Sequence, residues 1–323
     1  MSQAAVVEND FIIPLIDFSG FLNGTPDERK SIAKDILHGF QSAGFVYLQN
    51  LPISPVTRQR VFDTSGKLFR LSSEAKKVIS MPSIQSNRGY SAQGQEQLCS
   101  RTIDFKETFH IGSENDAEHE NIWPSETGEL IGFKETISGF YDFCSTMSLE
   151  VVRAIAIGIG IDEDYFNSHM SFGDHKLRLL HYPEVRPEVF QSNAGQVRAG
   201  PHTDYGAITL LFQDNRGGLQ VKTPQGKFVD APAIENTVIV NAGDLLARWS
   251  NDKIKSTVHR VVEPSIRGEG NIHPARYSIA FFANPRKESF IEAIPGTFAT
   301  EADKKYQGIS SGDYYVERLN ATY

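Results

Sequence analysis

The spacing of apolar residues differs between the two halves of the chain. In the first half, apolar residues recur at helical intervals, which is typical of amphipathic helices. Such helices are expected to begin at Thr25, where Pro26 and Glu28 provide a first-turn proline and a capping glutamate, and at Ser54. A longer helix is expected over 130–158. The pattern therefore predicts that residues 1–160 are mostly helical.

From Lys176 onward, the apolar runs become short and are separated by Gly, Pro and Asn, a pattern that predicts β-strands. Several short strands with turns between them favour a sandwich or barrel, so the chain is predicted to be α+β. The strand-like segment 44–49 is a candidate to join this sheet, and 304–323 is expected to end in a helix packed on the outside. The six strands expected in the second half cover 176–182, 207–212, 219–222, 237–241, 256–261 and 276–282.

The composition fits one globular functional unit of 323 residues. A net charge of −8 argues against nucleic acid as a partner, because phosphate binding requires a basic surface. No apolar run is long enough to span a bilayer, and the N-terminus lacks the features of a secretory signal. Cys99 and Cys144 indicate neither a disulfide framework nor a thiolate metal site. We therefore expect a cytoplasmic monomer or weak homo-oligomer that acts on a small molecule, away from membranes.

Candidate metal ligands lie in two segments of the second half. Side chains alternate along a strand, so His202 and Asp204 are expected to face the same way. His259, on a later apolar strand, would complete two imidazole nitrogens and one carboxylate oxygen. This set leaves open positions on an octahedral metal and is associated with ferrous iron in oxygenases, whereas zinc favours a closed tetrahedron. We interpret the three residues as an iron site.

A possible anion receptor lies further along the chain. Arg276, Ser278, Ala280 and Phe282 share one face of an apolar strand. A guanidinium beside a hydroxyl can bind a carboxylate, and a buried guanidinium without an anion is costly. The segment therefore predicts an anionic co-substrate next to the metal.

These motifs together resemble the Fe(II)/2-oxoglutarate-dependent oxygenases of the isopenicillin N synthase-like group. His202-x-Asp204, His259 and Arg276-x-Ser278 carry the resemblance. Further motifs fall in family order: Ile13–Phe18, Gly44–Leu48, Asp104–Glu107, Gly217–Val221 and Asn241–Asp244.

The resemblance implies a double-stranded β-helix (jelly roll) over 176–285, braced by N-terminal helices and followed by a C-terminal tail or helix over 286–323. It also implies Fe(II), 2-oxoglutarate and O2 as cofactors and co-substrates, with His202, Asp204 and His259 as the catalytic metal ligands. Arg276, Ser278 and Tyr182 would then hold 2-oxoglutarate.

One position departs from the family pattern. Many relatives have Asn-x-Tyr-Pro where this chain has Leu180-His-Tyr182-Pro183. The tyrosine is retained, and the missing asparagine puts part of the hydrogen bonding to the co-substrate in doubt. Arg178, on the same strand face, is a candidate either for a substrate contact or for a structural ion pair.

Candidate substrate contacts are Asn87, Arg178, Tyr205 and Phe282. Aromatic walls with one amide and one guanidinium suit a small planar, polar heterocycle, although Phe282 could equally be core packing. This combination resembles the fungal thymine 7-hydroxylase group, which implies oxidation of a methyl group. Two alternatives within the enzymes are a fungal tailoring oxygenase for an aromatic polyketide or alkaloid and an oxidase that does not use 2-oxoglutarate. A ligand-binding protein on a decayed oxygenase scaffold is the alternative outside them.

Overall fold

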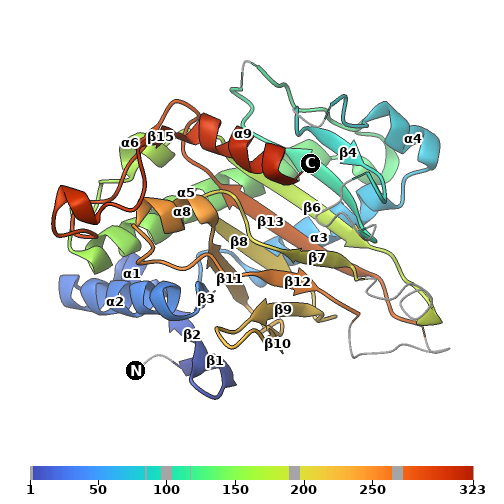
Figure 1. Cartoon of the computed structure of the whole chain (residues 1–323). Coiled ribbons are helices and arrows are strands. Elements are labelled where there is room, and N and C mark those ends of the chain that lie inside the picture. The colour runs from blue at the N-terminus through green and yellow to red at the C-terminus, as the bar shows by residue number, and fades with distance from the viewer. Residues whose placement is uncertain are drawn as a thin grey trace.

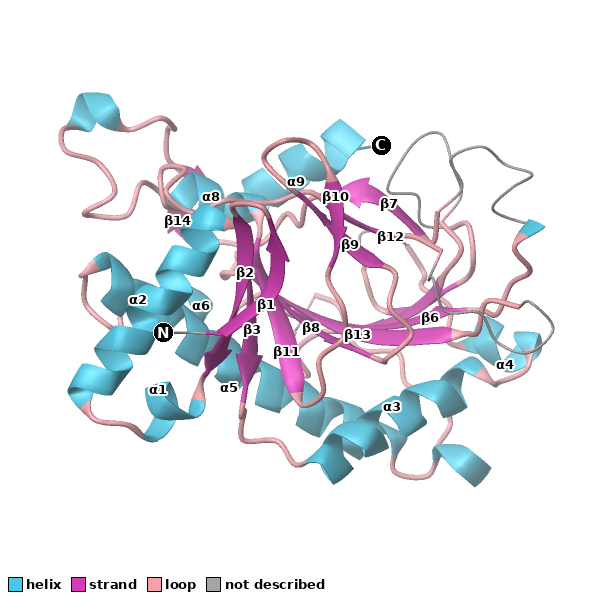
Figure 2. Ribbon diagram, turned by 90° about the horizontal axis from the view of Figure 1, so that it is seen from below, coloured by secondary structure: helices cyan, strands magenta, loops and turns pink. Residues whose placement is uncertain are grey.

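Two β-sheets face each other in the computed structural model of the chain (Figures 1 and 2). The structure describes residues 3–83, 86–95, 104–116, 118–188, 197–263 and 272–322, with side chains described up to Arg318. Within these ranges, no helix has the length and apolar character needed to cross a membrane. The expected loop over 264–274 and Cys99 lie largely or wholly outside the described residues.

The larger sheet has nine strands and brings both halves of the sequence together. Its strands, in spatial order, are β1 (Gln3–Glu8), β2 (Phe11–Asp17), β3 (Phe45–Gln49), β11 (Thr237–Ala242), β8 (Ile208–Gln213), β13 (Arg276–Ala283), β6 (Lys176–Tyr182), β5 (Glu107–Ile111) and β4 (Gly89–Ser91). The segment 44–49 joins the sheet as predicted, because β3 pairs with β11. The N-terminal half thus adds five strands to the sheet as well as helices.

The smaller sheet lies over one face of the larger one. Its order is β10 (Phe228–Asp230), β9 (Leu219–Lys222), β12 (His259–Val261) and β7 (Ala199–His202). The strand expected over 256–261 begins only at His259, because the preceding residues leave the sheet to contact α2 through Thr257 and Lys255. A two-stranded sheet of β14 (Phe290–Ile291) and β15 (Ile309–Ser310) lies apart from these.

Helices cover the other face of the large sheet (Figure 2). The predicted N-terminal capping box is confirmed, because the Thr25 hydroxyl accepts the Glu28 amide while the Glu28 carboxylate accepts the Thr25 amide. The helices are α1 (Ser19–Asn23), α2 (Pro26–Ser42), α3 (Pro55–Phe69), α4 (Ser73–Val78), α5 (Phe133–Ile159), α6 (Asn167–Met170), α8 (Asp244–Trp249) and α9 (Ser311–Thr322).

Strand alternation divides the interior into two regions. On β13, Ile279 and Phe281 face the helices and join a large apolar core with α2, α3 and α5. Arg276, Ser278 and Ala280 face the space between the two sheets, which holds a second and smaller apolar cluster. The candidate functional residues lie on this second side.

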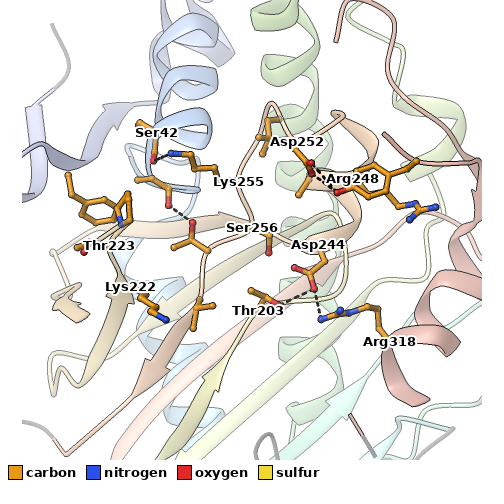
Figure 3. A pocket seen from close by; sticks show the side chains of 18 of the residues that line it. Ser42, Thr203, Lys222, Thr223, Asp244, Arg248, Asp252, Lys255, Ser256 and Arg318 are labelled. Atoms are coloured by element: carbon orange, nitrogen blue, oxygen red, sulfur yellow. Dashed lines mark hydrogen bonds and ion pairs between the residues drawn. The ribbon is translucent and has the colours of Figure 1, made fainter. Parts of the chain in front are cut away.

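The C-terminal helix α9 is tied to the loop after β7 by a salt bridge (Figure 3). The Asp244 carboxylate binds the Arg318 guanidinium at 2.8 Å and accepts a hydrogen bond from the Thr203 hydroxyl at 3.0 Å. These groups border an open cavity of about 670 Å³ that also reaches Thr257. The cavity adjoins the outer side of the segments that carry the candidate metal ligands.

Candidate metal and co-substrate site

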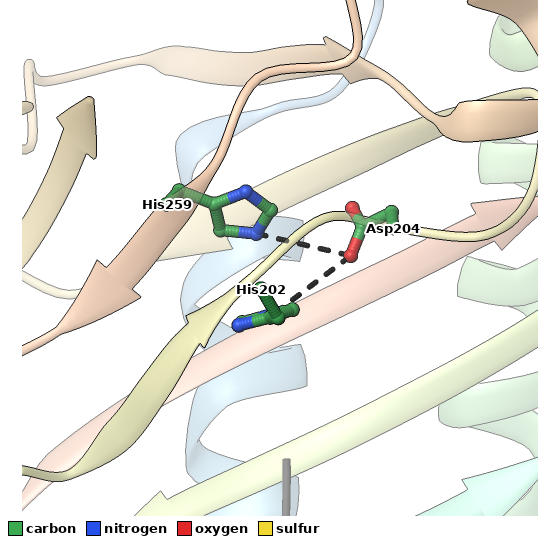
Figure 4. A group of neighbouring side chains, drawn as sticks. All are labelled: His202, Asp204 and His259. Atoms are coloured by element: carbon green, nitrogen blue, oxygen red, sulfur yellow. Dashed lines mark ion pairs between the residues drawn. The ribbon is translucent and has the colours of Figure 1, made fainter. Parts of the chain in front are cut away.

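The three predicted metal ligands meet between the sheets (Figure 4). His202 ends β7 and lies opposite His259, the first residue of β12. The Asp204 Oδ1 atom lies 3.9 Å from Nε2 of His202 and 3.8 Å from Nε2 of His259. All three ligand atoms lie within 4.8 Å of one another. Asp204 is not on the strand, as alternation had suggested; it reaches the site from the loop that follows β7.

Backbone carbonyls fix the orientation of both imidazoles. His202 donates from Nδ1 to the Gly200 carbonyl at 2.7 Å, and His259 donates from Nδ1 to the Thr257 carbonyl at 3.2 Å. A carbonyl can only accept, so Nδ1 carries the hydrogen in each ring. The Nε2 lone pairs are therefore left for a shared metal ion.

The Asp204 carboxylate is also held in place. Its Oδ2 atom accepts hydrogen bonds from the Thr209 hydroxyl at 2.6 Å and from the Asn241 amide at 2.7 Å. Burial alone would raise the Asp204 pKa, but the nearby His259 and His202 and these two hydrogen bonds hold the pKa below its usual value. Burial, together with His259, lowers the pKa of His202 to about 3. An ionised carboxylate and a neutral imidazole are the forms that bind a metal, so the donor set fits ferrous iron.

Arg276 lies buried on the same inner face, with 1% of its surface exposed. Its two terminal nitrogens donate to the Ser278 hydroxyl and to the Gln213 side-chain oxygen, both at 3.0 Å. The Tyr182 ring lies 5.0 Å from the guanidinium carbon. Within the described ranges, no carboxylate pairs with Arg276 and its Nε has no hydrogen-bond partner. A buried cation in this state fits the far carboxylate of 2-oxoglutarate.

One cavity collects all but two of the predicted site residues. It is lined by His202, Asp204, His259, Arg276, Ser278, Tyr182, Arg178 and Phe282. Arg178 and Phe282 come together at one side of this cavity, with the guanidinium carbon 5.1 Å from the ring centre. The cavity is thus bordered by a possible metal site, an anion receptor and a cation–aromatic pair.

Asn87 and Tyr205 lie outside that cavity lining. The Asn87 side-chain oxygen accepts a hydrogen bond from Nδ1 of His110 at 2.6 Å, and His110 lies opposite Arg178 in the β5–β6 pairing. The Tyr205 ring lies 5.1 Å from the Arg318 guanidinium carbon and lines a separate cavity of about 270 Å³ beside α9. The substrate contact predicted for Tyr205 therefore stays a prediction.

Sequence reasoning missed several polar residues that hold the site together. Thr209 and Gln213 are inward-facing polar positions on an otherwise apolar strand, and Asn241 occupies such a position on β11. That departure from apolar character was a visible signal. Their partners were not visible, because Asp204 and Arg276 become their neighbours only when distant strands pair.

Comparison with known proteins agrees with this geometry. The family model for the 2OG-Fe(II) oxygenase superfamily matches residues 173–285, and the model for the N-terminal region of non-haem dioxygenases in morphine synthesis matches residues 13–126. The 2-oxoglutarate-Fe(II) type oxidoreductase ppzD of Metarhizium rileyi is 34% identical over 95% of this chain and 90% of its own length.

Solved structures of the full-length thymine 7-hydroxylase from Neurospora crassa are more similar. The complex with alpha-KG has a TM-score of 0.95 and 57% identity over 99% of both chains. The complex with alpha-KG and thymine has a TM-score of 0.94 and 56% identity over 99% of this chain and all of that one. The complex with alpha-KG and 5-formyluracil has a TM-score of 0.93 and 57% identity over the same shares of the two chains.

These similarities extend over nearly the whole chain and include both the fold and the arrangement of the candidate iron ligands. They decide against the alternatives of a ligand-binding protein and of an oxidase that does not use 2-oxoglutarate. The chain belongs to the 2OG-Fe(II) oxygenase superfamily and is a 2-oxoglutarate-dependent dioxygenase with a jelly-roll core.

Proposed function

We propose that this dioxygenase oxidises the methyl group of thymine or of a closely related methylated pyrimidine. The observation that carries the proposal is the 56% identity to a structure that holds thymine together with alpha-KG. A second complex of the same protein holds 5-formyluracil, in which the thymine methyl group has become an aldehyde. Such a pair of ligands is consistent with stepwise oxidation of one methyl carbon.

In this proposal, the cavity residues divide into three groups. His202, Asp204 and His259 bind iron, and Arg276, Ser278 and Tyr182 bind 2-oxoglutarate. When bound, iron and 2-oxoglutarate supply the oxidant for a C–H bond, with release of succinate and carbon dioxide. The protein orients the two imidazoles, holds the far carboxylate against Arg276 and keeps water away from the buried site.

The remaining residues suit a flat heterocycle with ring carbonyls. Phe282 offers an aromatic face, and the Arg178 guanidinium beside it can donate hydrogen bonds to a carbonyl oxygen. The methyl group of a ring bound there would need to face the metal site, which lies in the same cavity.

The Asn87 amide has a defined orientation that supports the same class of substrate. Its oxygen can only accept, so His110 donates from Nδ1, and Nε2 of His110 accepts from the Thr108 hydroxyl at 2.7 Å. The NH2 group of Asn87 is then the part that can donate to a ligand. We propose that Asn87 and Arg178 both recognise carbonyl oxygens, as a pyrimidinedione requires.

Succinate formation in the presence of different substrates tests the proposal. Thymine is expected to stimulate succinate release most strongly and to yield the hydroxymethyl product. Uracil is the matched control, because it keeps both ring carbonyls and lacks the methyl group. If thymine stimulates no more than uracil while methylated aromatic polyketides do, the substrate belongs to natural-product metabolism and the proposal is wrong.

A further inference from the structure

A buried ion pair lies directly before β5, in the motif Asp104-Phe-Lys106-Glu107. Asp104 and Lys106 are 1% and 3% exposed, and Lys106 lines the cavity that contains the metal ligands. Glu107 points to the opposite side of the sheet, where it binds His181 at 2.6 Å. Alternation along this segment therefore places one ion pair beside the candidate iron site, and the roles assigned so far do not use it.

The pair is connected to an iron ligand through one residue of β7. Lys106 donates from Nζ to Oδ2 of Asp104 at 2.8 Å, and Oδ1 of Asp104 accepts the backbone N–H of Gly200 at 3.2 Å. The carbonyl of the same glycine accepts Nδ1–H of His202 at 2.7 Å. Asp104 thus holds the residue whose carbonyl sets the orientation of the His202 ring.

The position of β7 explains why such a contact is needed. This strand is at the edge of the small sheet and pairs only with β12. The backbone groups on its other edge have no neighbouring strand, and buried backbone groups require partners. The Asp104 carboxylate takes the place of a strand at Gly200. A carboxylate at this depth is stable only with a counter-charge, which Lys106 supplies.

We propose that Asp104 and Lys106 are positioning residues for the iron site. Asp104 fixes the β7 backbone at Gly200 and, through it, the angle at which His202 presents Nε2. Lys106 keeps the Asp104 carboxylate in place. This inference rests on His202 being an iron ligand, as stated above, and it does not depend on the identity of the substrate.

The chain contains a matched control pair. Lys176, at the start of β6, binds the carboxylate of Asp174 at 2.5 Å, with the same spacing of two residues and with the lysine side chain 10% exposed. Asp174 lines the cavity beside α9 and not the one that contains the metal ligands. Removal of either pair takes away a buried ion pair next to the same sheet, but only one pair contacts the backbone beside an iron ligand.

The test measures metal binding without substrate. Asp104→Ala and the double variant Asp104→Ala/Lys106→Met are compared with Asp174→Ala and Asp174→Ala/Lys176→Met. Calorimetry gives the affinity for Mn(II), anaerobic absorbance gives the charge-transfer band of the Fe(II)·2-oxoglutarate complex, and thermal melting gives the stability of each variant. The double variants remove both charges, so that one of them remains foldable if a single change leaves a buried charge without its partner.

The Asp104 variants are expected to bind Mn(II) roughly 10- to 100-fold more weakly and to shift the absorbance band, as is usual when a group that orients a metal ligand is lost. The Asp174 variants are expected to melt earlier with unchanged metal affinity. Equal metal affinity in the two sets would overturn the inference, whatever the melting temperatures. His202→Ala in the same assay separates the two ideas, because retention of Mn(II) by that variant would instead overturn the ligand assignment.

Discussion

The two faces of the large sheet have different compositions although the same strands form both. On β13, the residues toward the helices are Tyr277, Ile279, Phe281 and Ala283, and those toward the small sheet are Arg276, Ser278, Ala280 and Phe282. The helix side is a continuous apolar core. The cavity side carries a buried arginine, hydroxyls, amides and the metal ligands within a smaller apolar cluster.

This difference indicates how the molecule separates stability from chemistry. Burial of apolar area on the helix side stabilises the fold without requiring one exact geometry. On the cavity side, polar groups are buried at a cost and each is held by a specific partner, as Asp204 is by Thr209 and Asn241. Substitutions on the two faces should therefore have separable effects.

The largest expected effect is on the cavity side, at the iron site. Asp204→Ala removes the carboxylate that faces both imidazoles and should abolish turnover, because two nitrogens alone hold iron weakly. Succinate release is the measurement, with circular dichroism as the check on folding. Undiminished succinate release from a folded variant would refute the ligand assignment.

On the helix side, Phe281→Ala should destabilise the protein by about 3–5 kcal/mol, the usual cost of truncating a buried phenylalanine. Phe281 is fully buried against Tyr141 at a ring distance of 5.3 Å. Denaturant unfolding measures the loss. Phe282→Ala is the matched control one residue along, and it should cost little stability but weaken the response to substrate. The comparison fails if both variants change the same quantity.

Acid should weaken the helix side through His175. Burial lowers the pKa of this imidazole from 6.5 to about 4, and its ring lies 5.3 Å from Phe281. The unfolded chain therefore binds a proton below pH 6.5 that the folded chain refuses until about pH 4. Stability is then lost as the pH falls through this window, by up to roughly 3 kcal/mol. The loss should be absent in His175→Gln, as measured by denaturant unfolding at pH 7 and pH 4.

Arg276→Ala should chiefly raise the concentration of 2-oxoglutarate needed for half-maximal rate, by about 100-fold. That factor corresponds to about 2.7 kcal/mol, within the range for loss of a charged partner. Arg198→Met is the control, since Arg198 is also buried beside the Tyr182 ring but donates to the backbone carbonyl of Pro274. An unchanged dependence on 2-oxoglutarate in Arg276→Ala would place the carboxylate elsewhere.

Local sequence patterns predicted the parts of the molecule that depend on local geometry. The strand over 176–182 and the inward face of β13, with Arg276 and Ser278, follow from alternation within one segment. The capping box at Thr25 depends on residues within one helical turn. These features are determined over a few residues, so the sequence contains their full signal.

Contacts between distant segments were less predictable. Asp204 was expected on a strand but reaches the site from a loop, because β7 ends at His202. The partnership of Arg276 with Gln213 depends on the pairing of β13 with β8, which no local pattern specifies. Tyr205, only one residue from a proposed ligand, faces α9 because the C-terminal helix packs there.

The smallest of these effects is expected at Asn241, where the two faces can be compared within β11. Asn241→Ala removes one of the two hydrogen bonds to Oδ2 of Asp204 and leaves the Thr209 hydroxyl as the other. The carboxylate should then rotate more freely and bind metal roughly 10- to 100-fold more weakly. Val240, the preceding residue, is fully buried in the core on the helix side. Val240→Ala should lower the melting temperature without changing Mn(II) affinity, because it alters packing and leaves Asp204 in place. If Val240→Ala weakens Mn(II) binding as much as Asn241→Ala does, then metal affinity follows overall stability, and the division of labour between the two faces is wrong.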